Sequence, residues 1–289
     1  MRLRSKFDAG QFAVMVEMEP PKGADVSEMV GNARRVKGKV DAFLVPEMSN
    51  AVMRMSSLGG AMALQKAGLD PVMQANCRDR NRIALQADLL AAYACGIHGV
   101  MAVTGQDPSY GDHHQARSVY DIDLVELLEA IETLEQGRDM AGIELSGAPR
   151  FLTGSTVEAG SRGKSVELEV AEMNRRAAAG AEFFITPPVF DVSVLDRFLG
   201  RIDRRTVKIV PKVLLLKSLG MARYMAANMP QTYIPDAMIE RIQKAPDKVR
   251  ECTRIAVETI GALKDAGVAG ALLATLGWEH KLPEILAEI

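Results

Sequence analysis

The sequence has few cysteines, few aromatic side chains and almost no net charge. Only three of its 289 residues are cysteines, Cys77, Cys95 and Cys252, and no two of them form a CxxC pair. A disulfide framework or a structural zinc site is therefore not expected. Aromatic residues make up 5% of the chain and the formal net charge is −2. We expect neither a stacking platform for single-stranded nucleic acid nor a basic surface for a nucleic-acid backbone.

Long apolar segments are also lacking. No run approaches the roughly 18 consecutive apolar residues of a membrane-spanning helix. The charged residues 1–8 are not followed by the apolar core of a signal peptide. Hydrophobic residues make up 48% and charged residues 25%, which is typical of a globular domain rather than a disordered chain. We therefore expect a cytoplasmic protein that does not insert into a membrane.

One pattern repeats along the chain: a short apolar run, a polar loop, and a segment with helical periodicity. The expected strands are 12–18, 41–46, 71–76, 98–104, 149–153, 182–186, 207–213 and 269–275. The expected helices are 25–38, 52–67, 80–95, 123–136, 165–179, 192–203, 217–228, an additional stretch over 235–266 that is broken near Pro246, and 281–288.

These elements predict the fold class. Continuous apolar strands are typical of a parallel sheet that is buried on both faces. Several expected helices end at a glycine, as at Gly68, Gly96, Gly180 and Gly267, where a left-handed C-terminal turn is common. Eight strand–helix units predict an α/β fold, a (β/α)8 TIM barrel that occupies residues 1–289 as a single domain. An open doubly wound sheet is the alternative.

In a TIM barrel, functional residues gather at the C-terminal ends of the strands. Glu17 alternates with Val16 and Met18 near the end of the first strand. If those two neighbours pack against helices, Glu17 points into the barrel mouth. A partly desolvated carboxylate there would suit a general acid. A salt bridge from Glu17 to a loop arginine is the structural alternative.

The segment Cys-Arg-Asp-Arg-Asn, residues 77–81, follows the third strand. Its two arginines could face an anionic ligand beside a helix N-terminus. Alternatively, Asp79 or Asn81 caps the next helix and the arginines are solvated. We interpret Cys77 as a buried small apolar residue rather than a nucleophile, because no histidine is a partner at the sequence level.

Two further segments invite a ligand-binding interpretation. The polar loop 105–119 is long enough for a lid or a binding loop. Its Asp112, His113 and His114 could suggest a metal, but adjacent loop histidines are more often solvated, so we predict no metal. Residues 160–165 resemble a Walker A motif, but Glu158 stands where its first glycine is required. No strand-linked GxGxxG motif supports a Rossmann dinucleotide site.

Several motifs together resemble the methylenetetrahydrofolate reductase family, most closely a divergent member of its short bacterial, acetogen-like branch. The matching segments are VEMEPPKG (16–23), NAVMRMS (50–56), CRDRNRIALQADLL (77–90), GIHGVMAVTG (96–105), SVYDID (118–123) and AGAEFFITPPVFD (179–191). The resemblance implies a (β/α)8 barrel that holds FAD and takes hydride from NADH or NADPH. It also implies reduction of 5,10-methylenetetrahydrofolate to 5-methyltetrahydrofolate.

The resemblance and the strand-end positions together give a set of candidate residues. Glu17 matches the family's glutamate that delivers a proton to N10 of the folate. The expected FAD-binding residues are Gln74, Asn76, Arg78, Arg80, Thr104, Gly105, Gln106, Asp107, Tyr120, Asp123, Glu169, Arg175 and Arg176. The expected substrate-binding residues are Thr186 and Lys212.

Three positions depart from the family pattern. Gln106 stands where the family has an aspartate that stabilises the iminium cation, Pro187 replaces a glutamine, and Trp278 lies where an arginine is frequent. The alternative function is therefore a non-redox C1-pterin-binding subunit of a methyltransferase or a larger redox complex. A third interpretation is a methyl-transferring barrel with a corrinoid partner. We expect a small-molecule folate as the partner, and a homo-oligomer or a subunit of a C1-metabolism complex.

Overall fold

The computed structural model describes residues 1–229 and 231–289 and contains a closed barrel of eight parallel strands. Each strand pairs with the next along the chain, and β8 pairs with β1. The strands are β1 (Ala13–Glu17), β2 (Ala42–Val45), β3 (Pro71–Asn76), β4 (Gly99–Val103), β5 (Leu152–Thr156), β6 (Phe183–Pro188), β7 (Lys208–Leu214) and β8 (Gly270–Ala274). The predicted TIM barrel is confirmed, and the open sheet is excluded.

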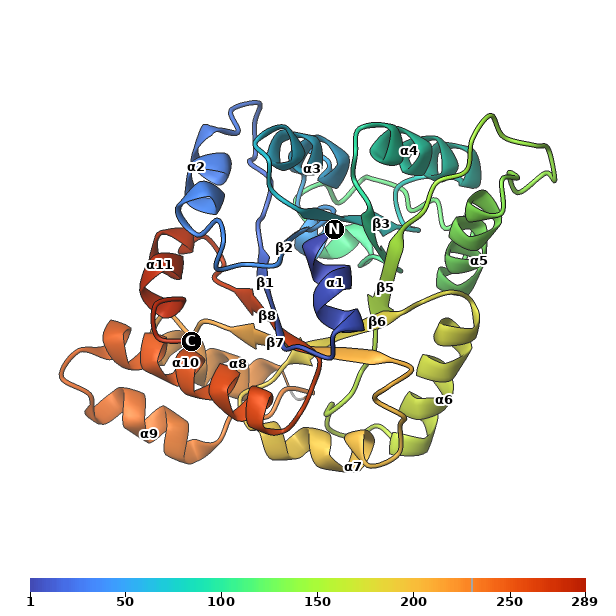
Figure 1. Cartoon of the computed structure of the whole chain (residues 1–289). Coiled ribbons are helices and arrows are strands. Elements are labelled where there is room, and N and C mark those ends of the chain that lie inside the picture. The colour runs from blue at the N-terminus through green and yellow to red at the C-terminus, as the bar shows by residue number, and fades with distance from the viewer. Residues whose placement is uncertain (230) are drawn as a thin grey trace.

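Helices form an outer ring around the strands (Figure 1). The α-helices are α1 (Arg2–Asp8), α2 (Ser27–Arg35), α3 (Ser57–Lys66), α4 (Arg82–Ala94), α5 (Leu124–Glu135), α6 (Val166–Ala178), α7 (Asp196–Leu199), α8 (Leu219–Asn228), α9 (Asp236–Lys244), α10 (Lys248–Asp265) and α11 (Leu282–Ile285). Short 3-10 turns are η1 (Ser49–Ala51), η2 (Pro108–Tyr110), η3 (Val192–Leu195) and η4 (Glu279–Lys281). In the described part of the chain, no helix combines the length and apolar character that crossing a membrane requires.

Most sequence-predicted elements are present, with shifted ends. The stretch 235–266 divides into α9 and α10 around Pro246, as predicted. The four predicted helix-ending glycines all have a positive φ. Helix α1 was not predicted. It lies across the middle of the ring in Figure 1 and packs Leu3 and Phe7 with the side chains of the barrel interior, so it closes the N-terminal end of the barrel.

The fifth strand differs most from the prediction, since it begins three residues later, at Leu152. Its sequence, Leu-Thr-Gly-Ser-Thr, resembles a loop in composition. The reason is Phe183, whose ring fills the barrel interior beside Gly154. A Cβ at Gly154 would collide with that ring. Glycine in this strand therefore makes room for a neighbouring aromatic side chain rather than marking a turn.

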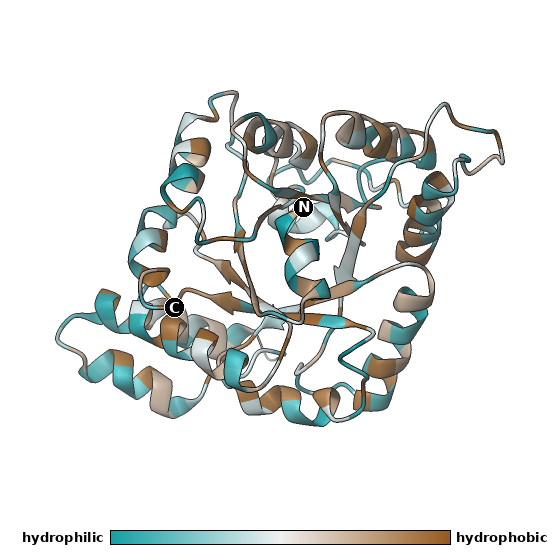
Figure 2. Ribbon diagram, viewed as in Figure 1, coloured by the Kyte–Doolittle hydropathy of each residue, from teal (hydrophilic) through white to brown (hydrophobic). Residues whose placement is uncertain are grey.

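The apolar core has two layers. Val16 and Met18 belong to the layer between strands and helices, whereas Met15 and Leu272 fill the barrel interior. Figure 2 shows that the strands are mostly hydrophobic, whereas the surrounding helices carry both hydrophobic and hydrophilic residues. Alternation along β1 therefore turns Glu17 toward the interior, at the C-terminal end of the barrel.

Candidate active site

Glu17 is the last residue of β1. Its side chain contacts a lysine of β7, which lies two strands away around the closed barrel. Lys212 Nζ of β7 lies 2.8 Å from Glu17 Oε2. The two side chains are 26% and 14% exposed, respectively. Glu17 therefore has the inward position that its alternation predicts. It also forms a salt bridge, but to a strand lysine rather than to the loop arginine considered from the sequence.

A second carboxylate lies beside this pair. Glu19 Oε1 is 3.2 Å from Arg54 Nε, in the loop after β2. Burial raises the pKa of Glu19, and the negative charges of Glu17 and Glu279 add to that increase, whereas Arg54 and Lys212 oppose it. The barrel mouth thus carries several carboxylates whose charges influence one another.

A cavity of about 320 Å³ opens next to the mouth, between the tops of β3 and β4 and helices α5 and α6. We call it the α5–α6 cavity. Its lining residues are Cys77, Thr104, Tyr120, Ile122, Asp123, Leu124, Val125, Glu172, Arg175 and Arg176. The structure therefore brings together five of the residues expected to bind FAD. Cys77 is buried, and burial raises its thiol pKa to about 12, which fits an unreactive side chain.

Local hydrogen bonds fix the walls of the α5–α6 cavity. Tyr120 has a φ of 41° and its hydroxyl donates to the carbonyl of Gly105 at 3.2 Å. Asp123 caps α5, because its Oδ1 accepts from the backbone N–H groups of Val125 and Glu126. Arg176 Nη1 donates to the carbonyl of Thr156 at 2.6 Å. Tyr120 and one guanidinium are thus held in place before any ligand binds.

The arginines of segment 77–81 are neither solvated nor free. Arg78 is 2% exposed, donates twice to the Asp79 carboxylate at 2.7 Å, and donates through Nη1 to the carbonyl of Gln106. Arg80 pairs with the buried Glu47 and with Asp88, each at 2.8 Å. Both guanidinium groups therefore hold neighbouring segments in place.

Polar residues within β3 and between β3 and α4 also build the frame of the site. Asn81 caps α4 by accepting from the N–H of Ala84, as one sequence interpretation proposed. Gln74 Oε1 accepts from the backbone N–H of Glu47 at 2.8 Å. Asn76 Nδ2 donates to Asp79 Oδ2 at 3.1 Å. These bonds join the ends of β2 and β3 beneath the loop that follows β4.

The structure shows the surroundings of two departures from the family pattern, Gln106 and Pro187. Next to Gln106, the Asp107 carboxylate accepts from the N–H of Ser109, and hydrogen bonds from the Ser109 side chain and backbone lower the Asp107 pKa. That oxygen is therefore engaged within its own loop. On β6, the Thr186 hydroxyl donates to the carbonyl of Pro187 at 2.7 Å. Proline has no N–H to offer a ligand at this position.

Glu169 lies apart from Arg175 and Arg176, although the resemblance grouped the three. It lines a separate hollow of about 270 Å³ at the start of α6, together with the loop 160–164. Glu169 is 3% exposed, and its Oε2 has no hydrogen-bond partner in the described structure. Burial raises its pKa to about 7, while Lys164 opposes this increase. A buried carboxyl oxygen without a partner is an open acceptor for a ligand hydroxyl.

The loop 105–119 is tied across the mouth, a feature that the sequence did not reveal. We call this loop the Asp112 strap. Asp112 accepts from Lys22 Nζ and from the N–H of Met53 at 2.9 Å, and it contacts His113 Nδ1 at 2.9 Å. A Cβ at Gly111 would collide with the carbonyl of Ala51. The strap therefore joins the loops that follow β1, β2 and β4.

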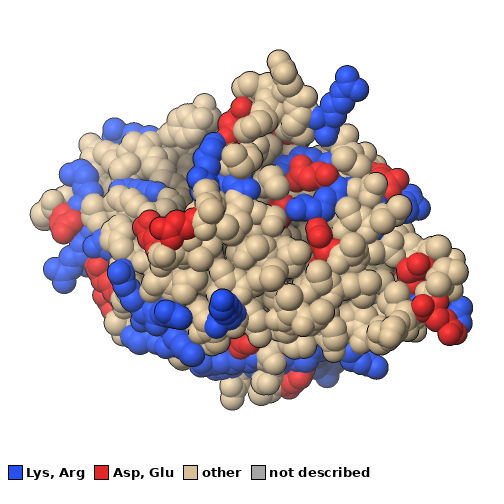
Figure 3. All heavy atoms as spheres, turned by 90° about the horizontal axis from the view of Figure 1, so that it is seen from above, with Lys and Arg blue, Asp and Glu red and all other residues tan. Residues whose placement is uncertain are grey.

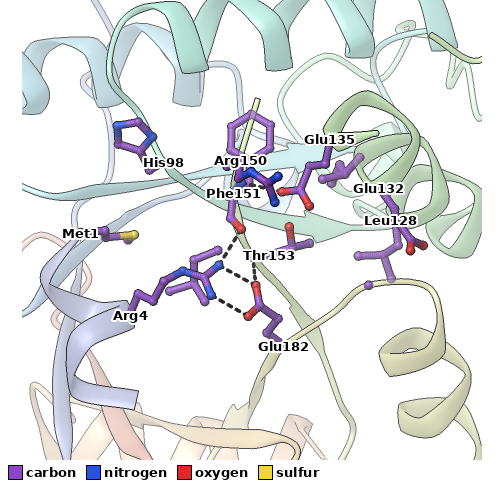
Figure 4. Close-up of a pocket in the computed structure, with 13 residues that line it drawn as sticks. Met1, Arg4, His98, Leu128, Glu132, Glu135, Arg150, Phe151, Thr153 and Glu182 are labelled. Atoms are coloured by element: carbon purple, nitrogen blue, oxygen red, sulfur yellow. Dashed lines mark hydrogen bonds and ion pairs between the residues drawn. The ribbon is translucent and has the colours of Figure 1, made fainter. Parts of the chain in front are cut away.

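Another cavity, of about 690 Å³, lies at the opposite end of the barrel. Figure 4 shows Arg4 facing Glu182, with bonds of 2.8 and 2.9 Å to its two carboxylate oxygens. Arg4 also donates to the carbonyl of Phe151. Phe151 immediately precedes β5 and Glu182 immediately precedes β6. The cavity therefore opens at the N-terminal ends of the strands, whereas functional residues of TIM barrels gather at the C-terminal ends.

On the face seen in Figure 3, both basic and acidic side chains are present. Together with a net charge of −2, this leaves recognition of an anionic ligand to local groups such as Arg175 and Arg176. In the described ranges 1–229 and 231–289, no three His, Cys, Asp or Glu side chains are grouped as a metal site.

Comparison with known proteins identifies a family by sequence and solved structures with a similar fold. The profile of the family described as methylenetetrahydrofolate reductase matches residues 2–289. No curated protein matches the chain by sequence. The solved structure of an EDTA monooxygenase (EmoA) from Chelativorans sp. BNC1 is similar, with a TM-score of 0.58 and 11% identity, over 96% of this chain and 92% of that chain. At this identity the likeness concerns the fold alone.

Proposed function

The chain belongs to the methylenetetrahydrofolate reductase family, and we propose that it is a flavoenzyme that reduces 5,10-methylenetetrahydrofolate to 5-methyltetrahydrofolate. NAD(P)H or a partner protein would supply the electrons. The observation that carries this proposal is the α5–α6 cavity, where Thr104, Tyr120, Asp123, Arg175 and Arg176 line one hollow. FAD, when bound, supplies a ring system that accepts hydride from the donor and passes it to the folate carbon.

The residues present fit FAD. Arg175 and Arg176 offer guanidinium groups for a pyrophosphate, which arginine recognises through paired N–H donors. The unpartnered Oε2 of Glu169 would accept a hydrogen bond from a hydroxyl group. Arg78 holds the Gly105–Gln106 backbone in place through the carbonyl of Gln106. The proposed cofactor site therefore combines two hollows, one at each end of the same face of α6.

Glu17 is the proposed proton donor. Reduction requires the folate ring to open between N10 and the methylene carbon, and N10 then takes up a proton. Glu17 faces the barrel interior and is mostly buried, so a proton that it delivers to N10 is shielded from bulk water. Thr186 and Lys212 lie on the adjacent strands β6 and β7, and we propose that both belong to the substrate site, Lys212 through its side chain and Thr186 through its place at the end of β6.

The visible spectrum of the purified protein tests the cofactor claim. We expect flavin absorbance, or its appearance after incubation with FAD and removal of the excess. NADH and NADPH are then added separately under anaerobic conditions to identify the donor by bleaching. A protein that holds no flavin as purified and gains none from added FAD would contradict the proposal.

A second candidate function is a non-redox subunit that binds a C1-carrying pterin for a methyltransferase or a larger redox complex. Two observations favour it: the Asp107 carboxylate bonds to Ser109, and Pro187 offers no N–H. This candidate predicts folate binding without oxidation of NAD(P)H. Either function is compatible with a homo-oligomer or a C1-metabolism complex, which native mass spectrometry would detect.

A further inference from the structure

We propose that the proton delivered to the substrate originates on Lys212, so that the acid is the Glu17–Lys212 pair rather than Glu17 alone. This inference rests on the proposed function. The starting observation is the 2.8 Å separation of Lys212 Nζ and Glu17 Oε2 inside the barrel. The family resemblance supplied a role for Glu17, but none of this kind for Lys212.

The strand register explains how the two side chains meet. Lys212 of β7 aligns with Leu272 of β8, and Leu272 aligns with Met15 of β1. Glu17 lies two residues beyond Met15. Because the strands of a closed (β/α)8 barrel are tilted, the register shifts by about one residue per strand, so the position level with Glu17 two strands away on β7 is Lys212. The two side chains therefore belong to one interior layer at the C-terminal end of the barrel, above Met15 and Val210.

The pair poses a chemical problem that a lone glutamate would not. Lys212 and Glu17 form an ion pair, in which the glutamate is a carboxylate. A carboxylate has no proton to give, so Glu17 must first acquire one. Lys212 Nζ already donates a hydrogen bond to Glu17 Oε2 and is therefore positioned to supply that proton.

The other charged groups around the pair are engaged elsewhere. Glu19 pairs with Arg54 at the end of β1. After β8, Glu279 accepts from the Thr275 hydroxyl and from the N–H of Gly277. Lys217, which follows β7, donates to the carbonyl of Leu276. Lys212 is thus the cation that contacts Glu17 directly.

The proposed step balances in atoms and charge. An N–H bond of the Lys212 ammonium breaks and its proton passes to Glu17, which gives a proton to N10. The bond between N10 and the methylene carbon breaks, and its electron pair forms the new N10–H bond. The carbon remains bound to N5 as an iminium cation. Lys212 is left neutral, Glu17 is again a carboxylate, and water later returns the proton to Lys212.

This exchange gives Glu17 a second role. The neutral Gln106 cannot stabilise a cation by charge, and the Asp107 carboxylate is engaged with Ser109. We call the proton transfer from Lys212 through Glu17 to N10 the relay. After the relay, the regenerated Glu17 carboxylate faces the new iminium cation without an ammonium group to neutralise it. One positive charge has moved from Lys212 to the substrate, so the buried site gains no net charge.

The test uses the holoprotein with its flavin reduced anaerobically by dithionite and then mixed with 5,10-methylenetetrahydrofolate. Reoxidation of the flavin is followed in a single turnover between pH 5 and pH 10. The variants are Lys212→Met and Lys212→Arg. Lys208→Met is the matched control, because Lys208 lies at the other end of β7 and donates only to the carbonyl of Arg205. Flavin content and thermal melting establish that each variant is folded.

The relay predicts different results for the two Lys212 variants. In Lys212→Met, Glu17 must act alone, so the alkaline limb of the rate profile moves down by at least about two pH units, from the range of lysine toward that of glutamate. In Lys212→Arg, the ion pair persists but the guanidinium does not release a proton, so the rate at neutral and alkaline pH falls at least about 100-fold. Lys208→Met keeps the wild-type profile.

Two other outcomes overturn different claims. If Lys212→Arg restores both the rate and the pH profile, Lys212 merely positions Glu17 by its charge, and the relay is wrong while the proposed function stands. If the reduced wild-type flavin is not reoxidised by the folate, the proposed function fails and the relay fails with it. Should Lys212→Met not fold, the Arg variant alone decides between the two roles of Lys212.

Discussion

Replacing Glu169 with glutamine should stabilise the cofactor-free protein, but only at neutral and alkaline pH. Burial raises the folded-state pKa of Glu169 from an ordinary 4.5 to about 7. Well below pH 4.5 the carboxyl group is protonated in both the folded and the unfolded protein, so it does not change the free energy of unfolding. Between pH 4.5 and about pH 7 the carboxyl group ionises in the unfolded protein but not in the folded one, so stability falls as the pH rises. Above about pH 7 the full loss of stability is present.

The size of the effect follows from the shift. At about 1.36 kcal/mol per pH unit, a shift from 4.5 to about 7 corresponds to roughly 3 kcal/mol. Glu169→Gln removes the ionisation while keeping the shape of the side chain. We therefore expect the variant to be up to about 3 kcal/mol more stable than the wild type at pH 8, and about equally stable well below the ordinary pKa of 4.5.

Urea unfolding of the FAD-free proteins at a series of pH values measures this difference. Glu129→Gln, on the exposed side of α5, is the matched control and should change stability little at any pH. In the presence of FAD the order should reverse, because Glu169 then gains a hydroxyl partner and the variant binds FAD more weakly. A stability difference that is absent at pH 8, or equal at pH 5 and pH 8, would refute the reasoning about burial.

Three further changes have defined outcomes. Glu17→Gln should retain bound flavin but slow its reoxidation by methylenetetrahydrofolate at least about 100-fold in a single turnover, since the amide cannot relay a proton; a rate near wild type would count against Glu17 as the acid. Gly154→Ala should cost about 1–3 kcal/mol in urea unfolding, because its Cβ collides with the ring of Phe183. Asp112→Ala removes the contacts to Lys22 and Met53, so FAD should dissociate faster in stopped-flow fluorescence; an unchanged rate would show that the strap does not limit exchange.

The fold was largely predictable because its signals are local. Apolar strands followed by helical periodicity repeat eight times, and several of the helices end at a glycine. The inward direction of Glu17 follows from alternation alone. The predicted bounds of the fifth strand were wrong because its small residues resemble a loop. The reason for a glycine there is the ring of Phe183, which belongs to β6 and is distant in the sequence. Helix α1 has only seven residues, too few for a clear periodic signal.

The site was less predictable because its charges pair over long sequence separations. Arg80, in the segment 77–81 whose arginines could face an anionic ligand, pairs instead with Glu47 and Asp88 inside the protein. Neither partner is close to Arg80 in a way that the sequence pattern reveals. Lys212 and Glu17 are 195 residues apart. Glu169 and Arg176 share one helix face, yet seven residues separate them by about 10 Å along the axis, which places them at different hollows.

The central claim is that this barrel passes hydride from a flavin to a C1-carrying folate. Its most direct test is anaerobic mixing of the dithionite-reduced holoprotein with 5,10-methylenetetrahydrofolate, with product analysis by mass spectrometry. We predict that the flavin absorbance returns and that one 5-methyltetrahydrofolate forms for each flavin reoxidised. A flavin that stays reduced, with the folate bound but unchanged, would contradict the claim and favour the non-redox pterin-binding subunit.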